Sequence, residues 1–195
     1  MYARLRGPLA GPTAVFYEMF TLSITEDTYW LGLKHIHEAT KVGHWKLLLA
    51  IRWKSKNEGV DYRGASHIVF NGFKVESAVK EYTIRLKNIT YSSINHKFAH
   101  AELMAMKDQP FSSEGRVNAL TNVNCGMVSR GGWWFGNGYR MKDHNLKGYD
   151  PYAGCYYFCL NCRFVYSKNH DYKVKETFMG MQKCKDAKEC ELERE

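Results

Sequence analysis

The cysteines offer the most recognisable chemistry in this chain, because their number and spacing suit either disulfides or metal ligands. Six occur among the 195 residues, all from residue 125 onward: Cys125, Cys155, Cys159, Cys162, Cys184 and Cys190. An even number of clustered cysteines favours disulfides formed in an oxidising compartment. Cys159 and Cys162 have the spacing of zinc ligands, but a structural zinc site usually needs a second such pair. The sequence therefore predicts disulfides rather than a metal centre.

Histidines are the second candidate chemistry. His96 and His100 have the spacing to share one helix face, with Glu102 nearby, as a zinc-dependent hydrolase would require. Surface or packing histidines are the favoured alternative, because the chain has no hydrolase elbow, phosphate-binding loop or zinc-protease motif. His37 follows Ile36 on a short predicted helix, where we expect a structural hydrogen bond. We therefore predict no enzyme, no catalytic residue and no bound metal.

Residues 131–138 combine three bulky aromatics with flanking glycines, in the order Gly-Gly-Trp-Trp-Phe-Gly-Asn-Gly. Such a segment needs backbone freedom around a dense apolar cluster. The structural interpretation is a core anchor, which is favoured for at least one of Trp133 and Trp134. The functional interpretation is an aromatic wall of a shallow pocket that holds a sugar or a small apolar group.

The elements that must position these residues begin with strands. Trp45, Leu47, Leu49, Ile51 and Trp53 occupy every second position, which places them on one strand face and the intervening Lys46 and Arg52 on the other. A second apolar segment, residues 67–75, is interrupted by a turn at positions 71 and 72, and a third strand is expected over residues 82–86. Short links between the three predict an antiparallel meander, preceded by a short helix over residues 30–37.

The fold class that follows is α+β: a central, twisted, mainly antiparallel sheet with short helices and a loop-rich C-terminal half. Apolar residues make up 45% and charged residues 25%, which is a globular composition. The formal net charge is +8, but the basic residues are scattered, so we expect no nucleic-acid partner. No apolar stretch is long enough for a membrane span, and residues 1–12 contain no readable secretory signal. The chain is either intracellular or lacks the start of a longer secreted protein.

A series of segments between about residues 27 and 182 resembles, in the same order, the fibrinogen C-terminal domain family. Tyr29-Trp30-Leu31-Gly32 with Ile36-His37 is similar to the family's YWLG…IH stretch, and Cys125 followed by Gly132-Trp133-Trp134-Phe135 is similar to its C…GGWWY stretch. The further similar segments are the strand that ends at Arg52-Trp53, Phe73-Lys74-Val75, Tyr82-Thr83-Ile84-Arg85-Leu86, Phe111-Ser112-Ser113, Asn145-Leu146-Lys147-Gly148-Tyr149, and Tyr172-Lys173-Val174-Lys175 with Met179 and Met181.

The resemblance implies a domain organisation and a function. Residues 26–182 would form a partial fibrinogen-like domain, residues 1–25 remain unassigned because the family's first subdomain is missing, and residues 183–195 form a charged tail. The implied function is a secreted, non-enzymatic, lectin-like recognition module that binds a glycan, an acetylated group or a protein partner, as in innate immunity. The alternatives are a truncated relative with a structural or oligomerisation role, as a homo-oligomer, and the zinc-dependent hydrolase.

The resemblance also implies site residues. The peptide Asn124-Cys125 would be cis, as in the family, and would line an acetyl-binding pocket with aromatic walls from Trp134 and Tyr139 and a polar contact from His144. An ordinary trans peptide in a loop without a pocket is the alternative. The family's second cysteine after its GGWWY stretch is absent, so Cys125 is expected to be free or to pair with Cys155, Cys159 or Cys162, whereas Cys184 and Cys190 pair with each other.

Two further expectations concern cofactors and modification. The family's acidic calcium loop corresponds here to residues 114–118, where Arg116 and Val117 supply no oxygen ligands, so we expect no tight calcium site and no cofactor. Asn88-Ile89-Thr90 is the one N-glycosylation motif in the sequence, and it falls where the third predicted strand ends. We therefore predict a glycan on Asn88.

Overall fold

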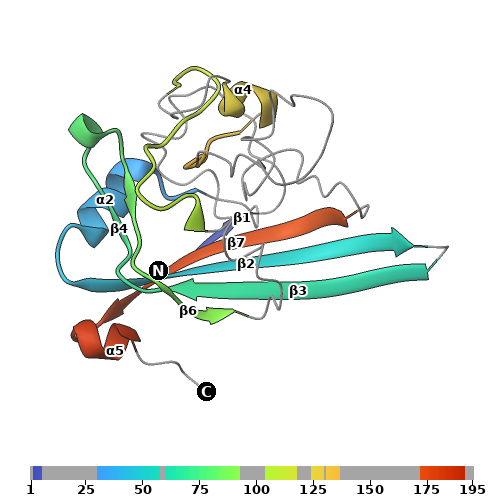
Figure 1. The fold of residues 1–195 in the computed structure, drawn as a ribbon, viewed down its shortest axis with the longest axis horizontal. Helices are drawn as coiled ribbons and strands as arrows, with labels where there is room; N and C mark the ends of the chain where they lie inside the picture. Colours follow the sequence, from blue (N-terminus) through green and yellow to red (C-terminus); the bar gives the residue numbers. More distant parts are fainter. Residues whose placement is uncertain are drawn as a thin grey trace, which may run out of the picture.

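The architecture comes from a computed structural model, which describes residues 2–5, 30–57, 60–92, 104–117, 124–129, 131–136 and 172–191. Within these ranges the chain forms a five-stranded sheet and a two-stranded sheet, with short helices at one end of the larger sheet (Figure 1). In chain order the elements are β1 (Tyr2–Leu5), α2 (Leu33–Thr40), β2 (His44–Asn57), β3 (Val60–Phe70), β4 (Lys74–Val75), η1 (Ala78–Lys80), β5 (Ile84–Arg85), β6 (Ile89–Ser92), α4 (Cys125–Ser129), β7 (Tyr172–Cys184) and α5 (Ala187–Glu191).

The larger sheet has the strand order β1-β7-β2-β3-β6, and every neighbouring pair is antiparallel. Its centre is the strand that the period-two pattern predicted, since β2 contains all five alternating apolar positions. Leu47 lies opposite Phe70 of β3 on one side and Met181 of β7 on the other. The prediction of a mainly antiparallel α+β fold is confirmed.

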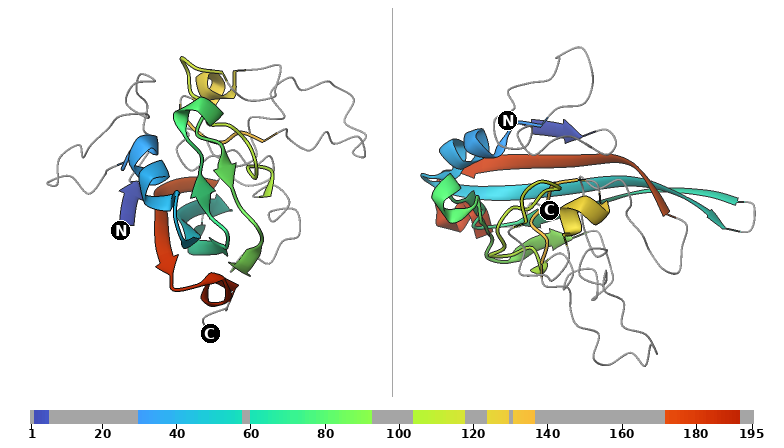
Figure 2. Two further views of the ribbon diagram at one scale, coloured as in Figure 1. Left: turned by 90° about the vertical axis from the view of Figure 1, so that its left-hand side faces the viewer. Right: turned by 90° about the horizontal axis from the view of Figure 1, so that it is seen from above.

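One face of this sheet carries the core. Leu47 and Leu49 are almost fully buried, and because residues opposite one another share a face, their partners on β3 and β7 are buried with them. The helix predicted before β2 is also confirmed: α2 buries Leu33 and Ile36. Figure 2 shows β2, β3 and β7 as one curved layer, with α2, η1 and α5 gathered at the same end of it.

Lys46 lies on the face of β2 opposite to that of Leu47, as the alternation predicts, and it is only 8% exposed, so this face is also covered near its start. One detail of the predicted strands was wrong. The third strand of the predicted meander does not join the larger sheet, because β5 pairs with β4 and the place beside β3 belongs to β6. The cause lies in Glu81 and Tyr82, whose φ angles of 53° and 49° are left-handed and turn the chain back onto β4 directly after η1.

Structure continues into the C-terminal segment that the sequence indicated as a charged tail. β7 ends at Cys184, and α5 follows with its first turn closed by Asp186, whose Oδ1 accepts a hydrogen bond from the Glu189 amide at 2.8 Å. A disulfide joins Cys184 to Cys190, as expected, with the two Cα atoms 5.5 Å apart. Among the described residues, none of the helices has the length and apolar character needed to cross a membrane.

Candidate functional site

The predicted ligand-binding region is built around α4. We use the name α4 junction for residues 112–116, 124–129, 133 and 134, which are far apart in the sequence and contact one another. Asn124 precedes the helix and caps it, since its Oδ1 accepts a hydrogen bond from the Met127 amide at 3.0 Å. Its Nδ2 donates to the backbone carbonyl of Glu114 at 2.9 Å. Asn124 therefore uses both polar atoms of its side chain to join α4 to the neighbouring turn.

That neighbouring turn is held by backbone hydrogen bonds and by close packing. The amides of Ser113 and Arg116 each donate to the other's carbonyl, at 2.9 and 3.2 Å. A Cβ placed on Gly126 would lie 2.2 Å from the carbonyl carbon of Ser113, so α4 approaches the turn backbone more closely than any other residue type would permit. The glycine after Cys125 is thus a packing requirement of the α4 junction.

The two tryptophans form the buried side of the α4 junction. Trp133 exchanges backbone hydrogen bonds with Ser112, at 3.0 and 2.9 Å, and is 1% exposed. The Nε1 of Trp134 donates to the Tyr82 carbonyl at 2.8 Å, and the Phe111 amide donates to the Glu81 carbonyl at 3.0 Å. The two left-handed residues, Glu81 and Tyr82, therefore provide the carbonyl acceptors for Phe111 and Trp134.

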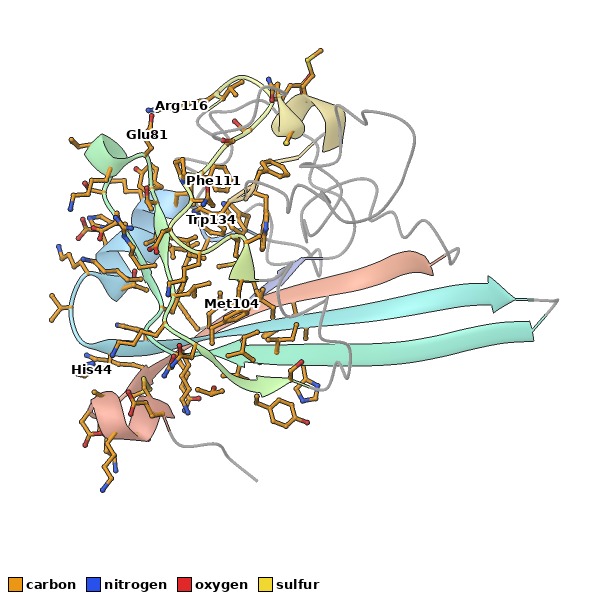
Figure 3. All side chains as sticks on the ribbon, in the orientation of Figure 1. His44, Glu81, Met104, Phe111, Arg116 and Trp134 are labelled. Atoms are coloured by element: carbon orange, nitrogen blue, oxygen red, sulfur yellow. A yellow bond between two sulfur atoms is a disulfide. The ribbon has the colours of Figure 1, made fainter. Side chains whose placement is uncertain are left out.

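Aromatic edge-to-face contacts reinforce this arrangement. Phe111 and Trp134 meet with ring centroids 5.2 Å apart and an interplanar angle of 82°, and Trp133 meets Trp134 at 5.3 Å and 69°. Figure 3 shows Phe111 next to Trp134, with Glu81 and Arg116 farther toward the outside of the molecule. The cluster ties residues 111–113 and 133–134 to the unit formed by β4, η1 and β5.

The predicted role of Trp134 as an aromatic wall needs correction. Its side chain is fully buried and its single donor is used by the Tyr82 carbonyl, so it has no surface to offer a ligand. The structural interpretation, a core anchor, holds for both tryptophans. For Trp134, burial is favoured because its large aromatic surface is shielded while its indole N–H still finds an acceptor in the Tyr82 carbonyl.

Of the other residues predicted to form the pocket, the structure describes Asn124 and Cys125 but not Tyr139 and His144. No cis peptide bond occurs among the described residues, so the Asn124–Cys125 peptide is trans, which corrects the cis peptide implied by the resemblance. The trans form agrees with the extended entry of a capping residue into a helix. Cys125 is buried and disulfide-bonded, which excludes a free thiol. Tyr139, His144, Cys155, Cys159 and Cys162 lie outside the described residues, as do His96 and His100.

Residues 114–117 are the described part of the segment that corresponds to the family's calcium loop, and the absence of a tight calcium site there stays a prediction. These residues are exposed and contain one carboxylate, that of Glu114. The backbone carbonyl of Glu114 already accepts a hydrogen bond from the side-chain Nδ2 of Asn124. Calcium requires six to eight oxygen ligands, several of them charged. Nothing in the described part of the chain groups three or more histidine, cysteine or acidic side chains around a common point.

An ion-pair network around Glu76 stabilises the unit of β4, η1 and β5, which contacts Trp134. Glu76 lies 3.4 Å from Lys74, 3.5 Å from Arg85 and 3.9 Å from Lys80. Burial raises the pKa of Glu76, but the Lys74 hydrogen bond and the surrounding positive charges outweigh burial, and the pKa is lowered below 4.5. Arg85 also pairs with Asp108 at 2.9 Å, which raises the pKa of the guanidinium. These charges hold β4 and β5 together and so fix the carbonyls at 81 and 82.

Two other predictions concern single residues. His37 makes the structural hydrogen bond expected of it, with its Nδ1 2.8 Å from the Val75 carbonyl. Thr40 supports the same joint between α2 and β4, because its Oγ1 accepts from the Val75 amide at 3.1 Å. Asn88 is exposed at the start of β6, which is the accessibility that a glycan requires, and its modification stays a prediction.

Comparison with known proteins gives a consistent family. Residues 16–183 match the family described as fibrinogen beta and gamma chains, C-terminal globular domain. Human tenascin-R is 30% identical over 157 residues, which cover 80% of this chain and 10% of tenascin-R. Mouse angiopoietin-related protein 6 is 30% identical over 132 residues, which cover 67% of this chain and 25% of that protein. The chain thus spans a quarter or less of the length of these relatives.

The solved structures agree on the fold. The fibrinogen-like globe domain of human ANGPTL6 superposes with a TM-score of 0.58 at 19% identity, covering 94% of this chain and 78% of that one. The shared architecture, together with the match over residues 16–183, establishes the relationship that the ordered motifs indicated. The chain belongs to the fibrinogen C-terminal globular domain family.

Proposed function

We propose that this chain acts outside the cell as a non-enzymatic recognition domain that binds a glycan, an acetylated group or a protein. Fibrinogen-like domains are recognition domains that bind protein or glycan ligands, and membership of the family supports the same role here. An extracellular location is further supported by the disulfide between Cys184 and Cys190, since disulfides persist in oxidising compartments.

The observation that carries the proposal is the anchoring of the dipeptide Asn124-Cys125. Asn124 is held by two hydrogen bonds, and Cys125 is buried in a disulfide beside Gly126, which packs on the turn at Ser113. A binding site needs a rigid base so that little ordering entropy is lost when a ligand arrives. The α4 junction supplies such a base, and Tyr139 and His144, which lie outside the described residues, are proposed to contact the ligand.

Binding to acetylated and unmodified carriers tests this function. The full chain, expressed by secretion, is expected to bind immobilised acetylated albumin and to be displaced by N-acetylglucosamine but not by glucosamine. Tyr139→Ala should weaken binding, whereas the exposed Tyr91 on β6, replaced in Tyr91→Ala, serves as a matched control that should not. Equal binding to acetylated and unmodified albumin would contradict the acetyl-group assignment, and a glycan array would then test the wider lectin-like role.

A structural or oligomerisation role is the second candidate, and two observations favour it. The Asn124–Cys125 peptide is trans, and Trp134 is withdrawn into the core, so two features of the implied pocket are changed. This candidate predicts no ligand on the array and a concentration-dependent mass in light scattering after size-exclusion chromatography. The hydrolase alternative predicts stoichiometric zinc in the purified protein, which elemental analysis measures directly.

A further inference from the structure

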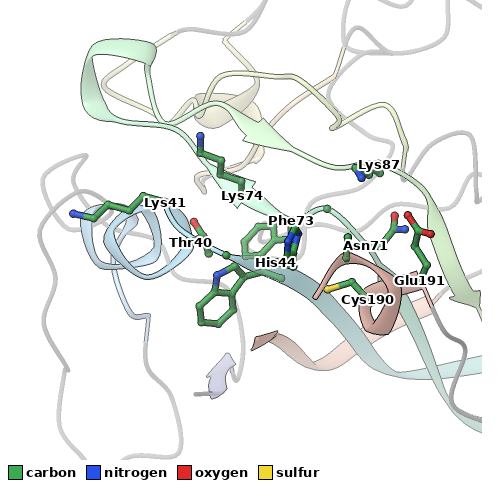
Figure 4. Close-up of a pocket in the computed structure, with 13 residues that line it drawn as sticks. Thr40, Lys41, His44, Asn71, Phe73, Lys74, Lys87, Cys190 and Glu191 are labelled. Carbon is green, nitrogen blue, oxygen red and sulfur yellow. The ribbon is translucent and has the colours of Figure 1, made fainter. Parts of the chain in front are cut away.

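A cavity of about 170 Å³ lies at the helical end of the larger sheet, away from the α4 junction (Figure 4). We call it the α5 cavity. It is formed where the end of α2, the start of β2, the turn between β3 and β4, and α5 meet. Its lining includes His44, Trp45, Asn71, Lys87 and Glu191.

Asn71 gives this cavity a fixed hydrogen-bond donor. The residue is 3% exposed, and its Oδ1 accepts a hydrogen bond from the Asn88 amide at 2.8 Å. Because a backbone amide can only donate, the other side-chain atom of Asn71 must be the NH₂ group. No partner for this Nδ2 occurs in the part of the chain that the structure describes, and the residue lines the cavity. The side-chain NH₂ group of Asn71 is therefore fixed in position, and no acceptor among the described residues uses it.

The backbone around Asn71 fixes this orientation. The Asn71 amide donates to the Asn88 carbonyl at 3.0 Å, and the Lys87 amide donates to the Asn71 carbonyl at 2.9 Å. Gly72 follows with φ of +63°, and a Cβ on it would lie 2.5 Å from the Cγ of Lys87. The aliphatic stem of Lys87 therefore lies across Gly72, which positions its ammonium group at the cavity.

Positive charge dominates the lining. Lys41, Lys74 and Lys87 contribute three cations, and Glu191 contributes the single carboxylate. Lys41 and Lys74 are paired with Glu38 and Glu76 outside the cavity. Lys87 has no ion-pair partner among the described residues, and His44 adds an exposed imidazole at the start of β2. In the view of Figure 4, Asn71 lies between His44 and Glu191, with Lys87 above it.

The walls combine this charge with an aromatic surface. Trp45 is half-buried, and its Nε1 is fixed by a hydrogen bond of 3.0 Å to the Val42 carbonyl, so its ring can present an apolar face without leaving a polar atom unsatisfied. The opposite wall is α5, which the disulfide between Cys184 and Cys190 holds against the start of β2 and the end of β7. A rigid donor, a free cation and an aromatic face are what a saccharide site uses.

From this arrangement we propose that the α5 cavity binds one sugar residue that carries a carboxylate or a sulfate. The acidic group lies at Lys87 and His44, a ring hydroxyl accepts from the Nδ2 of Asn71, and the ring stacks on Trp45. Ordinary ligand pockets occupy about 300–1,000 Å³, so this smaller cavity suits a single ring rather than a peptide segment. The site is separate from the one under Proposed function and goes beyond it.

Titration of the ¹⁵N-labelled full chain with glucuronate, glucose 6-sulfate, glucose and inorganic sulfate tests this proposal. The two acidic sugars should shift the Asn71 side-chain amide resonance saturably and bind at least about tenfold more tightly than glucose or sulfate alone, since each of these lacks one set of contacts. N-acetylglucosamine should leave this resonance unmoved, so failure here is distinguishable from failure of the acetyl-group function.

Variants localise the effect. Lys87→Gln should weaken binding of glucose 6-sulfate about tenfold, because a charged hydrogen bond is lost. Lys34→Gln is the matched control, since Lys34 is an exposed lysine of α2 that does not line the cavity, and its affinity should be unchanged. Asn71→Asp keeps the acceptor for the Asn88 amide but replaces the donor by an oxygen, and should abolish binding in a protein whose circular dichroism remains native.

Three outcomes would overturn the proposal. The first is the absence of any saturable shift with either acidic sugar. The second is equal weakening by Lys34→Gln and Lys87→Gln, which would mean that binding follows net charge alone. The third is inorganic sulfate binding as tightly as glucose 6-sulfate, which would reduce the cavity to a site for a bare anion.

Discussion

The two adjacent tryptophans allow the hydrogen bond from Trp134 to be measured against an internal control. Trp133 and Trp134 are 1% and 0% exposed, so replacing either by phenylalanine removes a similar buried volume. They differ in their indole N–H groups. That of Trp134 donates to the Tyr82 carbonyl at 2.8 Å, whereas that of Trp133 is buried with no hydrogen-bond partner among the residues that the structure describes.

The expected magnitudes follow from this difference. Truncation of a buried tryptophan to alanine costs about 3–5 kcal/mol, so we assign about 1–2 kcal/mol to the smaller change to phenylalanine, shared by both variants. Trp134→Phe additionally leaves the buried Tyr82 carbonyl without its donor, at about 1–3 kcal/mol. Trp133→Phe instead removes an unsatisfied donor, which regains about 1–3 kcal/mol. Trp134→Phe should therefore be less stable than Trp133→Phe by about 2–6 kcal/mol.

Urea unfolding followed by far-ultraviolet circular dichroism measures this difference, because tryptophan fluorescence changes with the substitutions themselves. In calorimetry the gap should appear as a Tm at least about 4 °C lower for Trp134→Phe, given about 2–4 °C for each kcal/mol in a chain of this size. Equal free energies of unfolding for the two variants, or a greater loss for Trp133→Phe, would refute the assignment of Trp134 as the anchor on the Tyr82 carbonyl.

Three further predictions concern the cap, the ion-pair network and the sequon. Asn124→Ala should destabilise the chain by about 0.5–2 kcal/mol and speed hydrogen exchange at the Met127 amide, since the α4 cap is lost; unchanged exchange there would contradict the capping role. Glu76 has a pKa below its ordinary 4.5, so its ionised form stabilises the fold above that pH and this contribution is lost as the pH falls. Thermal unfolding should therefore show the native chain more stable than Glu76→Gln at neutral pH, with the gap closing as the pH falls below 4.5; a constant gap would argue against the ion pairs. Secreted protein should lose mass on treatment with peptide-N-glycosidase, and Asn88→Gln should remove that shift; an unshifted native protein would show that the motif is unused.

The sequence predicted those elements whose pattern is local. Period two over residues 45–53 identified β2, because Leu47 and Leu49 on one face are buried and the strand is long enough for the alternation to be unambiguous. The turn at Asn71-Gly72 was predicted from residue type, and it is where β3 ends and Gly72 adopts a left-handed φ. The helix before β2 was predicted by its apolar spacing.

Pairing and burial depended on contacts that no local pattern contains. Glu81 and Tyr82 carry no signal for a left-handed conformation, which is uncommon for residues other than glycine, so the return of β5 onto β4 was missed. Trp134 finds its acceptor 52 positions away, and nothing in the segment around it distinguishes an anchored indole from an exposed one. The α5 cavity was missed for the same reason, because its walls come from four separate elements.

The anchoring pattern also determines which parts of the molecule should respond together. In the described part of the chain, Trp134 of the α4 junction donates to the Tyr82 carbonyl, and Phe111, which precedes the junction, donates to the Glu81 carbonyl, so these bonds lead to the unit of β4, η1 and β5. That unit is in turn held by the charges around Glu76 and by the joint between Thr40 and Val75. A perturbation of the Glu76 network should therefore be felt at Asn124 and Cys125 before it reaches the paired centre of β2 and β7. Parts of a protein that few contacts join can unfold separately. Loss of the Glu76 ion pairs should therefore loosen the α4 junction while the five-stranded sheet, and α5 with its disulfide between Cys184 and Cys190, remain folded.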